Sequence, residues 1–116
     1  MKKLIVSSVL AFITFSAQAA AFQVTSNEIK TGEQLTTSHV FSGFGCEGGN
    51  TSPSLTWSGA PEGTKSFAVT VYDPDAPTGS GWWHWTVANI PATVTYLPTD
   101  AGRRDGTKLP TGAVQG

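Results

Sequence analysis

A carboxylate and an imidazole flank the stretch of this chain that is best equipped for chemistry. Asp73 and His84 lie on either side of a segment made largely of Pro, Gly and Trp. If the runs on both sides form neighbouring strands, the two side chains converge at one end of a sheet. A carboxylate that accepts a hydrogen bond from one ring nitrogen turns the other nitrogen toward a ligand. We therefore predict a small anion-binding pocket at Asp73 and His84, with rigid walls of Pro and Trp.

The same residues leave two other kinds of chemistry open. In a hydrolase, Cys46 or Ser80 would be the nucleophile and His84 its base. Asp73 would then orient the imidazole, but an oxyanion hole is also needed. A metal site would draw on Asp73, Asp75 and His84, although no further His or Cys is expected to converge on them. We predict neither a catalytic set nor a metal or cofactor from this pattern.

Ordinary structural roles compete with each of these assignments. Asp73 and Asp75 stand beside prolines, where a short carboxylate is a common turn former. His84, between tryptophans, is explained equally well as a hydrogen-bonded core histidine. His39 has no companion and is expected to be structural or merely exposed.

The four tryptophans distinguish a pocket from a carbohydrate-binding surface. A sugar platform needs at least two flat, solvent-facing rings, whereas a pocket at His84 would bury Trp57 and Trp85. Period-two alternation places Trp83 and Trp85 on one strand face, with His84 on the other.

The elements that must position these residues are strands. Turn signals rich in Gly and Pro recur too often for helices of ordinary length. Residues 66–72 alternate apolar and small or polar side chains with period two, and 83–90 run without a breaker, so we predict two central strands. Further strands are expected at 22–25, 39–41, 55–57 and 94–97. The tail from residue 100 shows no period, and the whole pattern is typical of an all-β domain.

The first residues have the pattern of a secretory signal peptide. Lys2 and Lys3 precede an apolar run at 4–15, and small residues follow it in an A-x-A pattern. The run is shorter than the roughly 18 residues that a spanning helix needs, so a membrane anchor is the less favoured alternative. We predict cleavage after Ala21, with Ala19 as the alternative, and a periplasmic destination.

Charge and size exclude several further functions. Residues 22–116 suffice for one domain and carry five Lys and Arg against eight Asp and Glu. Without a basic patch, the domain is not expected to bind nucleic acid or to associate stably with anionic bilayers, and we expect no stable insertion into a membrane. Its single cysteine, Cys46, calls for a partner or is a free thiol in an oxidising compartment.

Several motifs together resemble one known family, the phosphatidylethanolamine-binding proteins, also called Raf-kinase-inhibitor-like proteins. The resemblance covers essentially all of 22–116, and its bacterial secreted branch is the most similar. The motifs are 73–77 (DPDAP), 81–85 (GWWHW), 89–91 (NIP), 46–53 (CEGGNTSP), 60–67 (APEGTKSF) and 109–116 (LPTGAVQG).

The resemblance implies an antiparallel β-sandwich with Greek-key connections and one anion pocket at its end. It makes Asp73 and His84 the main polar residues of that pocket. It places Asp75, Ala76, Pro77 and Trp82 at the rim. Family members act by binding lipids, nucleotides, small anions or protein partners, with no turnover generally attributed to them.

Family members also continue beyond the segment that ends here at Gly116. A Gly/Pro-rich loop, a further strand and a C-terminal helix follow there, and the loop is expected to hold the cysteine that faces Cys46. The present chain therefore corresponds to the N-terminal two-thirds of a family member. We expect a non-enzymatic binder of a small phosphoryl anion or phospholipid headgroup. The alternatives are a protein-interaction or inhibitor module that acts through its surface and, less favoured, a hydrolase that uses His84. The partners that we consider besides the anion or headgroup are another protein and a second copy of the chain in a homodimer.

Overall fold

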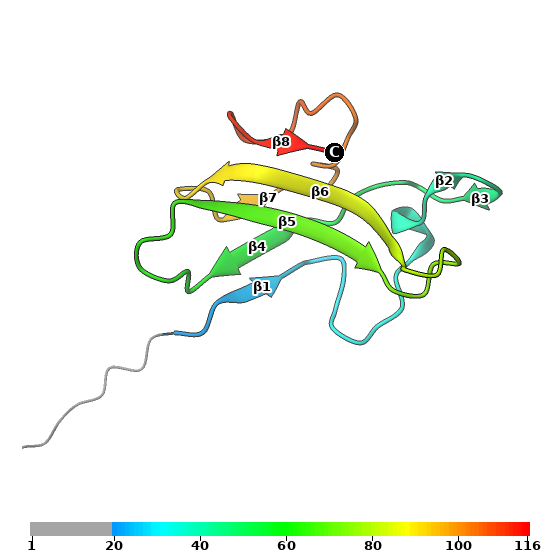
Figure 1. Ribbon diagram of the computed structural model, residues 1–116, viewed down its shortest axis with the longest axis horizontal. Helices are drawn as coiled ribbons and strands as arrows, with labels where there is room; N and C mark the ends of the chain where they lie inside the picture. The colour runs from blue at the N-terminus through cyan, green and yellow to red at the C-terminus, as the bar shows by residue number, and fades with distance from the viewer. Residues whose placement is uncertain (1–19) are drawn as a thin grey trace, which may run out of the picture.

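A computed structural model describes residues 20–116 of the chain (Figure 1). The predicted signal segment, 1–21, lies outside the described residues except for its last two positions. Among the described residues, no helix has the length and apolar character needed to cross a membrane.

Two long strands, six short ones and one turn of 3-10 helix make up the described fold. The elements are β1 (Gln23–Thr25), η1 (Thr37–His39), β2 (Ser42–Gly43), β3 (Cys46–Glu47), β4 (Leu55–Ser58), β5 (Ser66–Asp73), β6 (Trp82–Pro91), β7 (Tyr96–Leu97) and β8 (Val114–Gln115). All strand pairs are antiparallel, in one sheet ordered β1-β4-β7, a second ordered β5-β6-β8, and a separate β2-β3 hairpin.

The two three-stranded sheets face one another around a small apolar core (Figure 1). Trp57 of β4 and Leu97 of β7 meet Val87 and Ile90 of β6, all between 0% and 4% exposed. Between β4 and β5, β6 and β7, and β7 and β8, the chain passes from one sheet to the other. These crossings confirm the predicted antiparallel sandwich with Greek-key connections.

The observed strands differ from the predicted ones in four respects. The two strands of the β2–β3 hairpin are not among the predicted strands. Residues 39–41 do not form a strand: Val40 N–H donates to the Thr37 carbonyl at 3.2 Å, which closes the η1 turn instead. The strand expected at 94–97 begins only at Tyr96, because Val94 N–H closes a turn on Pro91. The tail supplies an unpredicted strand, β8. Backbone hydrogen bonds hold it against β6, and no alternation of side chains indicates it in the sequence.

The loop after β1 is fixed to the sandwich by one carboxylate, Glu28. Its Oε2 accepts hydrogen bonds from the Ser54 amide at 3.0 Å and the Ser54 hydroxyl at 2.5 Å, and from the Ser26 hydroxyl at 3.2 Å. Its Oε1 accepts from the Thr99 hydroxyl. These donors, Ser54 first and Thr99 next, lower the pKa of Glu28 from its ordinary 4.5 to about 2. We call this cluster the Glu28 junction.

Candidate functional site

The candidate site lies where the two long central strands end. Asp73 is the last residue of β5 and pairs with Trp82, the first residue of β6. The loop between them contains the Pro, Gly and Ser residues that separate the two strands in the sequence. The condition for the two side chains to converge is therefore met: β5 and β6 are neighbours, which brings Asp73 and His84 to the same end of the sheet.

A β-bulge decides which way the histidine turns. Val71 pairs with Trp85 but Tyr72 pairs with Trp83, so His84 is an extra residue in β6. The bulge places His84 Nε2 3.5 Å from Asp73 Oδ2, with both side chains a little under half exposed. The prediction that Trp83 and Trp85 share one strand face is wrong, because the inserted residue interrupts the alternation between them.

The tryptophans consequently form no common platform for a sugar. Trp57 is buried and Trp85 is half-buried, its indole N–H donating to the Gln115 side chain at 2.9 Å. Trp82 and Trp83 are 55% and 58% exposed, but consecutive residues of a strand point to opposite faces. Trp83 instead lies against the Tyr72 ring, with the ring centroids 4.6 Å apart.

The loop between the strands is held by hydrogen bonds of its own. The Asp75 amide donates to Asp73 Oδ1 at 2.9 Å, the Asx-turn arrangement expected beside proline. The Tyr72 hydroxyl donates to the Ser80 carbonyl at 2.6 Å, and the Thr78 hydroxyl donates to Gly81. Gly81 has a φ of +76°, and a Cβ there would collide with the Tyr72 ring, so this position requires glycine.

A cavity of about 620 Å³ opens beside the Asp73–His84 pair. Two separate parts of the chain line it, the β2–β3 hairpin region and the ends of β5 and β6 with their loop. The lining residues are Phe41, Phe44, Cys46, Asp73, Ala76, Pro77, Thr78, Trp82 and His84. The cavity thus has a small polar part between apolar and aromatic walls, as ligand sites usually do.

Residues just before and just after the β2–β3 hairpin contact one another and hold the hairpin in position. His39 Nδ1 lies 2.7 Å from the Thr51 carbonyl oxygen, which gives His39 the structural role predicted as one of its options. The Asn50 amide donates to the Val40 carbonyl at 2.9 Å and closes the base of the hairpin. A Cβ on Gly48 would overlap the Val40 backbone, so the two arms approach more closely than other residues allow.

Five of the six predicted site residues line the cavity. Asp73, His84, Ala76, Pro77 and Trp82 do so, whereas the side chain of Asp75 does not. Asp75 serves the site through its backbone amide, which holds Asp73.

Phe41, Phe44 and Thr78 also line this cavity, and no motif in the sequence points to them. Cys46, a candidate nucleophile on its residue type, lies exposed in the cavity wall. The Gly residues on both sides of Phe44 indicated a tight turn but not where it packs.

The charges around the cavity are few and mostly negative. Asp73 and His84 are the charged or titratable partners in its polar part, and no Lys or Arg is among its lining residues. Within residues 20–116, no group of three or more His, Cys, Asp or Glu side chains is placed to hold a metal ion.

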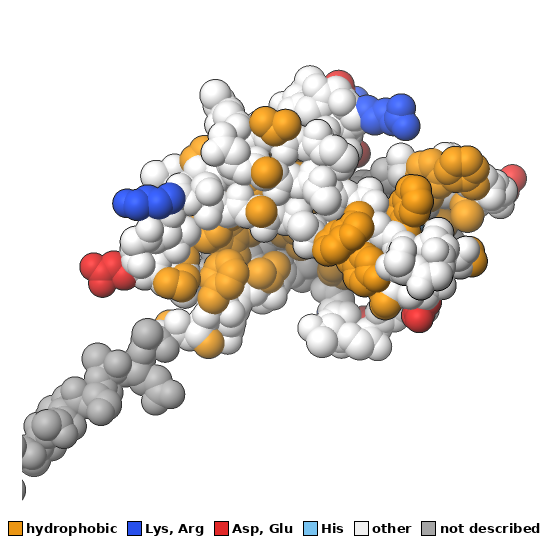
Figure 2. All heavy atoms as spheres, in the orientation of Figure 1, with side chains coloured by type: hydrophobic (Ala, Val, Ile, Leu, Met, Phe, Trp, Pro, Cys, Tyr) orange, Lys and Arg blue, Asp and Glu red, His pale blue; other side chains and the backbone are white. Residues whose placement is uncertain are grey.

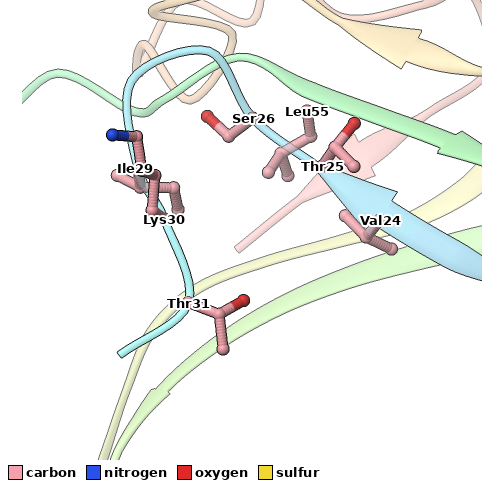
Figure 3. Close-up of a pocket in the computed structure, with 7 residues that line it drawn as sticks. All are labelled: Val24, Thr25, Ser26, Ile29, Lys30, Thr31 and Leu55. Carbon is pink, nitrogen blue, oxygen red and sulfur yellow. The ribbon is translucent and has the colours of Figure 1, made fainter. Parts of the chain in front are cut away.

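A second, smaller cavity of about 380 Å³ lies along β1. Figure 3 shows its lining: Val24 and Thr25 of β1, residues of the following loop, and Leu55 of β4. Its one charged side chain, Lys30, is exposed and lies 3.8 Å from Glu33. The conjunction of a carboxylate and an imidazole that marks the larger cavity is not found here.

Comparison with known proteins bears on the fold and the site together. The family model described as phosphatidylethanolamine-binding protein matches residues 25–116. The chain belongs to the phosphatidylethanolamine-binding protein family. This match covers every strand from β2 onward and both parts of the chain that line the larger cavity.

Individual members of the family are similar over different lengths. The chain is 96% identical over 116 residues to the UPF0098 protein YbcL of Escherichia coli (strain K12), of which it spans 63%. It is 57% identical over 77 residues to YbhB of the same organism, covering 66% of this chain and 49% of YbhB.

Solved structures of the family agree with the fold. A crystal structure of E. coli YbcL, described as a new member of the mammalian PEBP family, superposes with a TM-score of 0.80 at 96% identity. The match covers 82% of this chain and 58% of that one. The PEBP homolog CT736 from Chlamydia trachomatis gives a TM-score of 0.63 at 30% identity, covering 82% of this chain and 56% of that one. As predicted, these family members extend well beyond the part that this chain matches.

Proposed function

We propose that this chain binds a small phosphate-type anion or a phospholipid headgroup in the cavity at Asp73 and His84. The observation that carries the proposal is the approach of Asp73 Oδ2 to within 3.5 Å of His84 Nε2 in a cavity with aromatic walls. An imidazole N–H, neutral or protonated, donates a hydrogen bond to a phosphoryl oxygen. The apolar walls lower the polarity beside the pair, which strengthens that bond.

The carboxylate makes a zwitterionic headgroup a better ligand than bare phosphate. Two like charges about 4 Å apart repel by roughly 4 kcal/mol at an effective dielectric constant of 20, so Asp73 opposes a free dianion. An ammonium group on the same ligand reverses the sign of this interaction. Phosphorylethanolamine, which carries both charges, can place its ammonium near Asp73 and its phosphate near His84.

The geometry favours binding over turnover. A hydrolytic site needs its nucleophile in a hydrogen bond with the base. Cys46 lines the same cavity as His84, but no hydrogen bond joins the two in the described part of the chain. Ser80 is not a lining residue, and its carbonyl accepts from Tyr72. Binding without catalysis is accordingly part of the proposal.

From the predicted signal segment we further propose that this activity belongs to the periplasm. The positive start, the apolar run and the small residues of 1–21 are typical of exported bacterial proteins. Export would bring the cavity to the compartment between two phospholipid-containing membranes.

Titration followed by NMR tests the proposed function. Phosphorylethanolamine should shift the resonances of the His84 ring and the Asp73 amide, and inorganic phosphate should do so more weakly. The His39 ring serves as an internal control, because its Nδ1 is already 2.7 Å from Thr51 O. Equal shifts at both histidines, or none at His84 up to millimolar ligand, would contradict the assignment.

A further inference from the structure

One side chain outside the larger cavity connects both strand ends and the loop between them. Tyr72 precedes Asp73 in β5, and it is not among the residues that line the cavity. Its ring lies against Trp83 of β6, with the ring centroids 4.6 Å apart. Its hydroxyl donates to the Ser80 carbonyl at 2.6 Å. Tyr72 thus contacts the strand end and the loop on which the shape of the cavity depends.

The ring contact with Trp83 holds the part of β6 in which the bulge lies. Tyr72 pairs with Trp83, and His84 is the extra residue that follows. A bulge leaves its extra residue unpaired, so the direction of that side chain depends on what holds the residues beside it. A cross-strand aromatic contact of this kind stabilises the pair that makes it. The contact therefore helps to keep the imidazole turned toward Asp73.

The hydrogen bond to Ser80 holds the loop that forms one wall of the cavity. Ala76, Pro77 and Thr78 of this loop are lining residues. The Thr78 amide donates to the Ala76 carbonyl at 2.7 Å, and the Thr78 hydroxyl donates to the carbonyl of Gly81, the residue after Ser80. The wall is therefore joined to Ser80, and through Ser80 to β5.

The backbone of the loop also packs closely on the Tyr72 ring. A Cβ on Gly81 would collide with that ring, so the chain passes directly beside it. Figure 2 shows apolar side chains gathered over the ends of β5 and β6, where these contacts lie. All of them join residues within 72–83, so a change at Tyr72 acts on the loop and on the bulge directly.

We infer that Tyr72 is a positioning residue for the ligand site. Its hydroxyl holds the wall formed by the loop, and its ring holds the strand end that carries His84. The inference rests on the proposed function of the cavity and adds a residue outside the cavity that sets its affinity.

Tyr72→Phe tests the role of the hydroxyl, because it keeps the ring. The Kd for phosphorylethanolamine should rise about fivefold, the effect of one lost hydrogen bond. In the ligand-free protein, the NMR order parameters of the backbone amides at 76 and 78–80 should fall, since the loop has lost its attachment to β5. Tyr96→Phe is the matched control and should change neither quantity, because Tyr96 lies on β7 in the other sheet, outside the cavity.

Tyr72→Leu tests the role of the ring. It removes the contact with Trp83 as well as the hydroxyl. The Kd should rise further than in Tyr72→Phe, and the His84 ring resonances of the ligand-free protein should shift. Equal Kd values for the two variants, with unshifted His84 resonances, would overturn the role assigned to the ring.

Binding measured far below Tm separates positioning from stability. A residue that only stabilises the fold lowers Tm but leaves the Kd of the folded protein unchanged. If wild type binds phosphorylethanolamine, an unchanged Kd or unchanged loop order parameters in Tyr72→Phe overturn this inference and leave the proposed function intact. If wild type does not bind, the proposed function is overturned, and the loop order parameters alone decide whether Tyr72 holds the wall.

Discussion

Glu28 and Asp73 are carboxylates in two regions of one small sandwich, and their surroundings give them different roles. A carboxylate offers about four acceptor sites. Glu28 receives hydrogen bonds from Ser26, Ser54 and Thr99, all from the chain itself. Asp73 receives one from the Asp75 amide and otherwise only approaches His84 at 3.5 Å, on the wall of a cavity. A carboxylate whose acceptor sites are filled by its own fold stabilises that fold, whereas one with acceptor sites left over can bind a ligand.

The largest expected effect concerns the cavity at Asp73 and His84. His84→Ala should lower the affinity for phosphorylethanolamine by about ten- to a hundredfold, the loss of one hydrogen bond to a charged group. Tm should change little, because the ring is nearly half exposed and its ion-pair partner is itself a half-exposed carboxylate. Isothermal titration and thermal unfolding measure the two quantities. Unchanged affinity in a folded variant would show that His84 does not bind the ligand. His84 and Asp73 would then no longer differ in role from Glu28.

At the Glu28 junction, a substitution should lower Tm and leave ligand affinity almost unchanged. Glu28→Gln should lower Tm by several degrees, because the amide cannot replace a carboxylate that accepts from Ser54 and Thr99 together. Affinity for phosphorylethanolamine should stay within about threefold of wild type. Glu33→Gln is the control, since Glu33 is exposed and its partner Lys30 is 3.8 Å away. A Tm loss no larger than that of Glu33→Gln would show that the junction does not stabilise the fold.

At acidic pH, the Tm of wild type and the Tm of Glu28→Gln should become equal. The pKa of Glu28 is lowered in the folded state from 4.5 to about 2, so its stabilisation is complete above 4.5. That stabilisation is lost as pH falls from 4.5 through about 2, because the folded carboxylate must then take up a proton. Thermal unfolding across this range should show the two Tm values converging. A constant difference down to pH 2 would contradict the assigned cause of the shift.

The smallest expected effect is at Asp75. Asp75→Ala should change headgroup affinity by less than about twofold, because its backbone amide rather than its side chain holds Asp73. Asp75→Pro removes that amide and should weaken binding more than Asp75→Ala does. The same titration measures both. If Asp75→Ala weakens binding as much as Asp75→Pro does, the Asp75 side chain itself contributes to binding.

Much of the fold followed from local patterns. The alternation in 66–72 and the unbroken run in 83–90 correctly predicted the strands β5 and β6, because a period of two directly reflects the geometry of a strand. The DPDAP and GWWHW motifs likewise indicated the family and five of the cavity residues. By contrast, β8 depends on backbone pairing with β6, and nothing in its two side chains indicates it.

The sequence by itself determined the all-β class, the family, and the two residues at the polar part of the cavity. It did so because each depends on residue types at short spacing. Only the tertiary structure decided that a bulge turns His84 toward Asp73, that Phe41 and Phe44 complete the cavity, and that Glu28 joins three separate segments. These outcomes depend on register and on contacts between residues far apart in the chain. No local period encodes such contacts, because they form only when whole elements pack together.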